Sequence, residues 1–155
     1  MKRHLLWLLV LTLFVTPALA ERKQTFALSK RVYNLLQDVN EQLESENYPA
    51  AVELLDQILQ RDLSPYETAQ VWYLKGNAFY QVSELHLAEQ AFAKVVIDPD
   101  NIPELLRQGT LRTLTQLNLG LEQTERAKIY SQRLLQETTQ PEIDYALYAQ
   151  VLYRL

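Results

Sequence analysis

Residues 69–102 read AQVWYLKGNAFYQVSELHLAEQAFAKVVIDPDNI, and this stretch decides the fold. One helix face is indicated by Trp72, Gly76 and Phe79, which are four and three residues apart. A second is indicated by Ala88 and Phe92, which are four residues apart. Small residues let two helices cross closely, while aromatic side chains fill the space on either side of the crossing. The stretch therefore predicts two helices packed against each other.

The same helical periodicity extends on both sides of this stretch, interrupted by prolines at element boundaries. Ser64 can cap a helix, Pro65 suits its first position, and Glu67 can reach back to the Ser64 N–H. The sequences NIPE (101–104) and TQPE (139–142) repeat this combination. Because the joining loops are short, consecutive helices are expected to be antiparallel. We predict seven helices, over 29–46, 48–61, 65–82, 84–97, 102–119, 122–137 and 141–155.

Composition excludes several classes of site and fold. The 155 residues include no Cys, which rules out disulfides, thiolate nucleophiles and Cys-bearing metal sites. Three Gly are too few for a Gly-rich phosphate loop. The scarcity of Gly and Pro also argues against a turn-rich all-β domain.

The first twenty residues have the features of a secretory signal peptide. A basic start is followed by the apolar run LLWLLVLTLFV (5–15) and then by Ala18-Leu19-Ala20. The run is shorter than the ~20 residues that a spanning helix needs; an uncleaved anchor is the alternative interpretation. We predict a signal peptide over 1–20, an N-terminal extension over 21–28, a repeat domain over 29–155, and export to the periplasm with no stable membrane span after cleavage.

Charge and polar clusters give no support for an enzyme. Without Lys2 and Arg3, 13 basic and 19 acidic residues remain, so we expect no nucleic-acid binding. His86 has no catalytic or metal-binding partner at helical spacing. The residues DPDN (98–101) are too few for a calcium loop and are typical of a turn. We therefore predict no catalytic residue, no metal and no cofactor.

Residues 69–102 resemble one tetratricopeptide repeat (TPR), with Trp72, Gly76, Phe79, Ala88 and Phe92 as its packing signature. The match departs from the pattern at Lys75, where Leu is usual, and Pro99 comes one position early. Weaker units follow at shifts of 37 residues back and 39 forward, and a fourth unit has only its first helix. We predict an all-α, right-handed α-solenoid of antiparallel helix pairs with about three and a half TPR units; an unrelated helical bundle is the alternative.

Solenoids of this kind bind partners along a groove lined by the first helix of each pair. In the predicted register a carboxamide recurs at one groove position of every unit, and carboxamides can pair with the backbone of an extended peptide. The alternative is that these positions are simply solvated. The predicted partner-binding residues are Asn40, Tyr73, Asn77, Tyr80, Arg112, Gln116, Gln150 and Tyr153.

The last predicted helix is apolar or aromatic nearly all round, with Gln150 and Arg154 as exceptions. A terminal helix usually has a polar outer face. We therefore expect either that the natural chain continues or that this helix packs on another chain, including by self-association.

Three stretches, LSPYETAQVWYLKGNAFYQ (63–81), IPELLRQGTLRTLTQLNL (102–119) and EIDYALYAQVLYRL (142–155), resemble the exported TPR proteins that accompany TonB/ExbB/ExbD energy-transduction systems in Gram-negative bacteria. The resemblance implies a periplasmic accessory that binds a protein or extended peptide, such as a TonB- or ExbD-type envelope protein, with possible outer-membrane association. A second hypothesis is a structural scaffold or oligomerisation element in envelope assembly or cell division, without a groove ligand.

Overall fold

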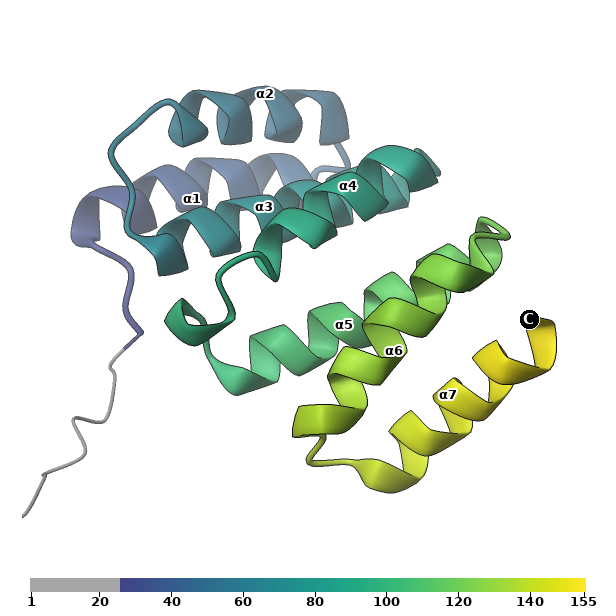
Figure 1. The fold of residues 1–155 in the computed structure, drawn as a ribbon. Helices are drawn as coiled ribbons and strands as arrows, with labels where there is room; N and C mark the ends of the chain where they lie inside the picture. The colour runs from purple at the N-terminus through teal and green to yellow at the C-terminus, as the bar shows by residue number, and fades with distance from the viewer. Residues whose placement is uncertain (1–25) are drawn as a thin grey trace, which may run out of the picture.

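The computed structural model describes residues 26–155, which form seven α-helices and one 3-10 turn and contain no strand (Figure 1). The predicted all-α class is confirmed, and every predicted helix end lies within two residues of the observed one. The 3-10 turn η1 (Pro99–Asn101) was not predicted. The helices are α1 (Lys30–Glu44), α2 (Tyr48–Leu59), α3 (Pro65–Gln81), α4 (Leu85–Val95), α5 (Glu104–Gly120), α6 (Thr124–Glu137) and α7 (Pro141–Arg154).

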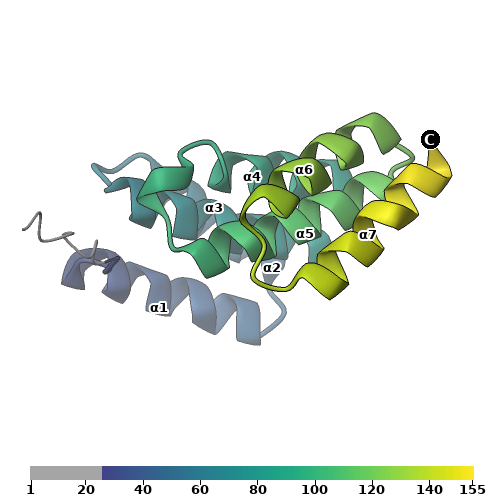
Figure 2. The same ribbon diagram turned by 60° about the horizontal axis from the view of Figure 1, so that its bottom comes forward.

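Each helix packs mainly on the helices next to it in sequence, so contacts run in succession from α1 to α7. Figures 1 and 2 show the pairs α1/α2, α3/α4 and α5/α6 laid side by side, with α7 after the third pair. This packing is compatible with a solenoid of helix pairs. Two apolar clusters follow the same order, one built from α1, α2 and α3 and one from α3 to α7.

The predicted start of α3 is confirmed in full. Ser64 Oγ accepts a hydrogen bond from the Glu67 N–H, and the Glu67 carboxylate accepts one from the Ser64 N–H at 2.8 Å. The starts of α5 and α7 differ, because neither helix has a side-chain cap. The Asn101 amide bonds to Asp98 at the preceding turn, and the Thr139 hydroxyl donates to Gln108.

Glu67 also joins α3 to α1. Its second carboxylate oxygen accepts a hydrogen bond of 2.8 Å from the N–H of Ser29, which is the N-cap of α1. Burial alone would raise the pKa of Glu67, but the hydrogen bonds from Ser29 and Ser64 outweigh it and lower the pKa from 4.5 to about 2. One buried carboxylate therefore caps two helices.

The three turns inside the helix pairs share one backbone geometry. Glu46, Ser83 and Glu122 each adopt a left-handed conformation, with φ of 56°, 61° and 58°. In each turn the left-handed residue and the one after it donate to carbonyls of the preceding helix, which is the Schellman arrangement. This geometry usually takes Gly, and here it recurs three times without one.

The predicted signal peptide, 1–20, lies outside the described residues. Of the predicted extension, Phe26 packs its ring on Tyr66 with centroids 5.7 Å apart, and Leu28 packs on the first apolar cluster. Within residues 26–155, no helix combines the length and apolar character that crossing a membrane requires.

Candidate binding groove

The α3/α4 pair is built around a close approach between Gly76 and Phe92. A Cβ placed on Gly76 would lie 2.8 Å from Phe92 Cδ1 and Cε1, so the aromatic ring occupies the space of the missing side chain. Phe92 and Ala88 are buried, and Trp72 and Phe79 pack at the edge of the same cluster. The small and aromatic residues singled out in the sequence therefore meet at one helix crossing.

Lys75, which departs from the repeat pattern, has a structural role of its own. Its ammonium lies 5.2 Å from the ring centroid of Trp72 and 5.7 Å from that of Phe79. It also forms an ion pair with Asp56 on α2. Lys75 thereby links the first helix pair to the second, which a Leu at this position could not do through charge.

Beside this crossing lies a cavity of about 390 Å³, bounded by α3, α4 and α5. Its walls combine apolar side chains from α4 with polar ones from α3 and α5. Three of the predicted groove residues are among them: Asn77 and Tyr80 on α3 and Gln116 on α5. The lining residues are Asn77, Tyr80, Leu85, Phe92, Thr113, Gln116, Leu117 and Gly120.

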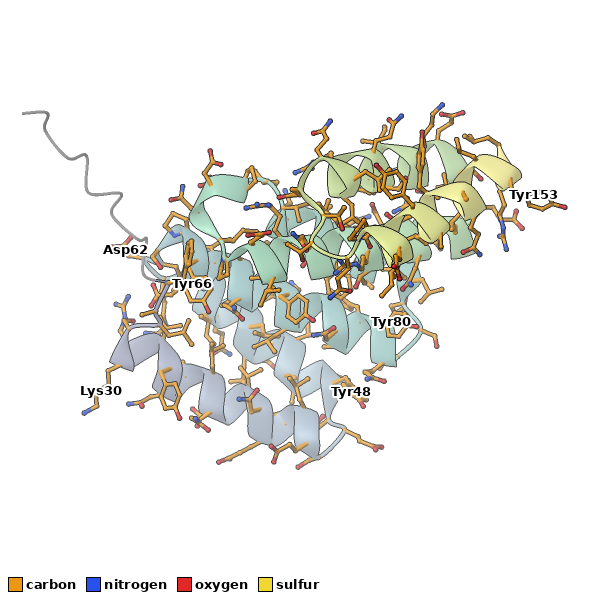
Figure 3. The ribbon with its side chains drawn as sticks, turned by 90° about the horizontal axis from the view of Figure 1, so that it is seen from below. Lys30, Tyr48, Asp62, Tyr66, Tyr80 and Tyr153 are labelled. Carbon is orange, nitrogen blue, oxygen red and sulfur yellow. The ribbon has the colours of Figure 1, made fainter. Side chains whose placement is uncertain are left out.

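The side chains of Asn77, Tyr80 and Gln116 can hydrogen-bond to a ligand without giving up an internal hydrogen bond. Within residues 26–155, none of their side-chain polar groups has a hydrogen-bond partner. The Tyr80 side chain is 53% exposed, and Figure 3 shows it near the end of α3. Together they offer two carboxamides and one phenol around a partly apolar hollow.

Two other predicted groove residues are engaged within the protein. The Arg112 guanidinium binds the buried Asp144 carboxylate through both oxygens, with Nε–Oδ1 at 2.6 Å and Nη2–Oδ2 at 2.9 Å. Burial alone would raise the pKa of Asp144, but hydrogen bonds from Arg112 and Thr138 lower it. Arg112 thus ties α5 to α7.

Tyr73 is half-buried and packs edge-on against Phe92, with ring centroids 5.7 Å apart.

The remaining predicted groove residues, Asn40, Gln150 and Tyr153, are exposed and do not line this cavity. Asn40 lies on α1, and Gln150 and Tyr153 lie on α7. In Figure 3 the Tyr153 side chain points away from the body of the molecule. The structure therefore brings three of the eight predicted residues together at one cavity, and the four-unit carboxamide ladder does not form one continuous pocket.

A buried polar cluster between α4, α5 and α6 was missed by the sequence analysis. Glu89 is buried and pairs with Arg126 Nη2 at 2.6 Å, while Tyr130 and Asn118 donate to the same carboxylate oxygen at 3.4 Å. The Asn118 Oδ1 atom is buried without a hydrogen-bond partner among the described residues. The sequence signal was weak, because Glu89 lies among ordinary helix residues and its partners are 29 to 41 positions away.

The polar residues set aside in the sequence occupy ordinary positions. His86 is exposed in the first turn of α4. Asp98 precedes η1 and Asn101 is its last residue, and their side chains hydrogen-bond to each other at 2.8 Å, as the turn interpretation predicts. Within residues 26–155 no cluster of His, Asp and Glu side chains is arranged to hold a metal ion.

Comparison with known proteins leaves the family open. The chain matches no protein-family model, and the comparison with curated proteins gives no significant match.

Proposed function

We propose that this chain is an exported, periplasmic TPR protein that binds a protein partner at the cavity between α3, α4 and α5. The supporting observation is the convergence of Asn77, Tyr80 and Gln116, whose side chains are free of internal hydrogen bonds, on one partly apolar cavity. The proposal is for binding without catalysis.

The chemistry of this cavity suits an extended peptide. A carboxamide both donates and accepts, so Asn77 and Gln116 can each pair with a peptide N–H and C=O at the same time. Tyr80 adds a broad contact surface with few rotatable bonds. The apolar wall formed by Leu85, Phe92 and Leu117 can take one side chain of the peptide.

The assignment to the TPR family rests on the packing of the α3/α4 pair. Gly76 and Phe92 make the small-against-aromatic contact that the repeat pattern requires, and the same turn geometry recurs in all three helix pairs of the described chain. The assignment to a TonB-type system rests on the resemblance of residues 63–81, 102–119 and 142–155. We propose a TonB- or ExbD-type envelope protein as the partner.

Site-specific photocrosslinking tests this binding site. A photoreactive phenylalanine at Tyr80 lies at the cavity, and the same residue at Tyr33 gives a matched control on α1, because the two tyrosines are 53% and 52% exposed. In a Gram-negative periplasm, we expect TonB, ExbD or a TonB-dependent receptor to crosslink at position 80 and not at position 33. Equal crosslinking at the two positions would contradict a specific groove.

A loss-of-binding pair sharpens the same test. Asn77→Ala combined with Gln116→Ala removes both carboxamides, and Asn40→Ala combined with Gln150→Ala removes two that lie outside the cavity. Each bidentate amide contact contributes about 1–3 kcal/mol, so losing both should weaken binding by about 30-fold or more. An equal effect of the second pair would instead favour a ladder along the whole groove.

The second candidate function is the scaffold or oligomerisation element. It is favoured by one observation, the exposure of large apolar residues on α7, including Tyr145 at 59% and Leu152 at 48%. This candidate needs no groove ligand, and the crosslinking experiment separates the two functions.

A further inference from the structure

A second hollow lies where the end of α4 meets η1 and α6. Its volume is about 590 Å³, and it shares no lining residue with the candidate groove cavity. In Figure 1 the end of α4, the η1 turn and the last turns of α6 lie on the same side of the molecule. The apolar part of its wall includes Val96, Ile97 and Tyr130, and its charged residues are Lys94 and Arg133. We call it the α4/α6 hollow.

Both charges of the α4/α6 hollow are positive, and both lack an internal counter-ion. Within residues 26–155, no carboxylate lies within ion-pairing distance of Lys94 or Arg133. Asp98 is the acidic residue nearest to Lys94 in sequence, but it lines a neighbouring hollow against α3, and its carboxylate accepts a hydrogen bond from Asn101. In a chain with 19 acidic and 15 basic residues, this hollow is therefore a local region of positive charge.

Arg133 is held in position by the backbone at the end of α4. Its Nη2 donates to the carbonyl of Val96, the C-cap residue of α4, at 3.1 Å. A guanidinium has five N–H donors, so this bond leaves the others free for a ligand. Because the side chain is half-buried and already oriented, binding costs it little conformational entropy. A carboxylate suits it best, since hydrogen bonds between two charged groups are the strong ones.

An exposed apolar residue stands beside the two cations. Ile97 is 66% exposed, whereas the adjacent Val96 is buried. Covering such a side chain with an apolar group of a ligand is favourable, because apolar surface is removed from water. A ligand that matches the α4/α6 hollow therefore carries a carboxylate and an apolar group close together, as a protein segment does where Asp or Glu is next to an apolar residue.

The surrounding charges favour a protein segment over an anionic membrane. A carboxylate inside the hollow meets Lys94 and Arg133 directly. A flat membrane surface would rest on the rim, where Asp98 and Asp100 are exposed on the loop that carries η1. These two carboxylates repel anionic headgroups.

We propose that the α4/α6 hollow binds a protein segment in which an acidic residue lies next to an apolar one. The carboxylate binds Arg133 and Lys94, and the apolar side chain packs on Ile97. This site is separate from the cavity between α3, α4 and α5, so the inference goes beyond the proposed function and does not depend on it.

Chemical-shift titration of the isotopically labelled chain, as processed by a Gram-negative host, tests this recognition. The probe is the capped peptide acetyl-Leu-Glu-Leu-amide, and acetyl-Leu-Gln-Leu-amide is its uncharged match. We expect backbone amide shifts over 93–99 and 130–133, with a dissociation constant on the order of 1 mM, because so short a peptide buries few side chains. The uncharged peptide should bind about tenfold more weakly, since it lacks the charged hydrogen bonds.

Charge-removing variants locate the site. Arg133→Gln should nearly abolish the preference for the acidic peptide, while Gln can still donate to the Val96 carbonyl. Lys94→Gln changes an exposed side chain without an internal hydrogen bond, so it leaves the fold intact and should weaken the acidic peptide by about threefold. Lys128→Gln removes a positive charge from α6 outside the hollow and should change neither peptide.

Several results would overturn the proposal. They are the absence of a saturable shift with the acidic peptide at tens of millimolar, equal binding of the two peptides, and a preference for the acidic peptide that survives both Arg133→Gln and Lys94→Gln. Binding to phosphatidylglycerol vesicles without binding to the peptide would overturn it in favour of a lipid headgroup. Failed crosslinking at Tyr80 would remove the groove function and leave this inference standing.

Discussion

The α3/α4 and α5/α6 pairs have the same backbone plan and different interiors. At the helix crossing, α3/α4 places Gly76 against Phe92, while the residues 39 positions later are Thr115 and Ser131. All four are buried. The bulky ring in one pair is thus replaced in the other by two small hydroxyl residues, one on each helix.

The hydroxyls of the α5/α6 pair are satisfied within their own helices. Thr115 Oγ1 donates to the Leu111 carbonyl at 2.8 Å, and Ser131 Oγ donates to the Lys128 carbonyl at 3.0 Å. A buried polar group without such a partner would be costly. The two pairs show that the space at the helix crossing can be filled by apolar or by polar side chains. The side chains of the two helices must together fill that space, and any buried polar group must be hydrogen-bonded.

The largest expected effect is at Phe92. Phe92→Ala removes a buried ring and leaves a cavity opposite Gly76, so it should lower the free energy of unfolding by about 3–5 kcal/mol. Ser131→Ala at the equivalent position should cost less than about 1 kcal/mol. Urea denaturation of both variants measures the two losses in free energy of unfolding. Equal losses would show that the two crossings do not differ in how strongly they depend on this residue.

The α3/α4 pair is also stabilised by the Glu67 carboxylate, and this contribution should be lost at low pH. The pKa of Glu67 is lowered from 4.5 to about 2 in the fold, so its stabilising effect is complete above pH 4.5 and is lost as the pH falls towards 2. The full effect is about 3 kcal/mol. Denaturation measured between pH 6 and pH 2.5 should show this decline, and Glu67→Gln should remove its contribution. If the free energy of unfolding of the Glu67→Gln variant fell with pH as steeply as that of the wild type, Glu67 would not be the residue that caps both helices.

The polar pair should respond to the loss of Arg112. Arg112→Ala leaves the buried Asp144 carboxylate without its cation, and should destabilise the protein by about 2–4 kcal/mol at pH 7. Because the pKa of Asp144 is lowered by this contact, the loss should shrink as the pH falls and the carboxyl protonates. A double-mutant cycle with Asp144→Ala measures the coupling. A coupling energy of zero would contradict the stabilising role of the Arg112–Asp144 pair and would favour Arg112 as a partner-binding residue.

The smallest effect concerns the turns that the pairs have in common. Ser83→Gly and Glu122→Gly replace left-handed residues by the one residue that adopts this conformation without strain, so each should stabilise the protein by about 0.5–1 kcal/mol. Gln81→Gly, in the last turn of the helix itself, is a control and should destabilise by about 1 kcal/mol. Thermal unfolding distinguishes the three variants. A lower thermal stability of the Ser83→Gly variant would mean that the Ser83 side chain stabilises the turn.

Local patterns made the helices and the Gly76–Phe92 crossing predictable. Helix periodicity, Pro65 and the Ser64/Glu67 box all act over a few residues, so they can be read without the fold. The left-handed turns were not predicted, because Glu46, Ser83 and Glu122 lack the usual Gly signal.

The candidate site was predictable only in part. Asn77 and Gln116 were found because they share one register position, and the helices bring them to one cavity. Arg112 shares a groove position too, but its contact with Asp144 joins residues 32 positions apart and depends on how α7 packs. Glu89 and Arg126 are a similar long-range pair. Charge pairing between distant helices was the information that local patterns could not supply.

The three matching turns have a consequence for how this chain can vary. Each helix reversal is held by the same two backbone hydrogen bonds, and its left-handed residue has an exposed side chain. The direction in which the second helix of a pair returns is therefore independent of what fills its crossing. A helix pair can then be exchanged as a block, and chimaeras that combine the interior of one pair with the turn of another should keep the same antiparallel reversal.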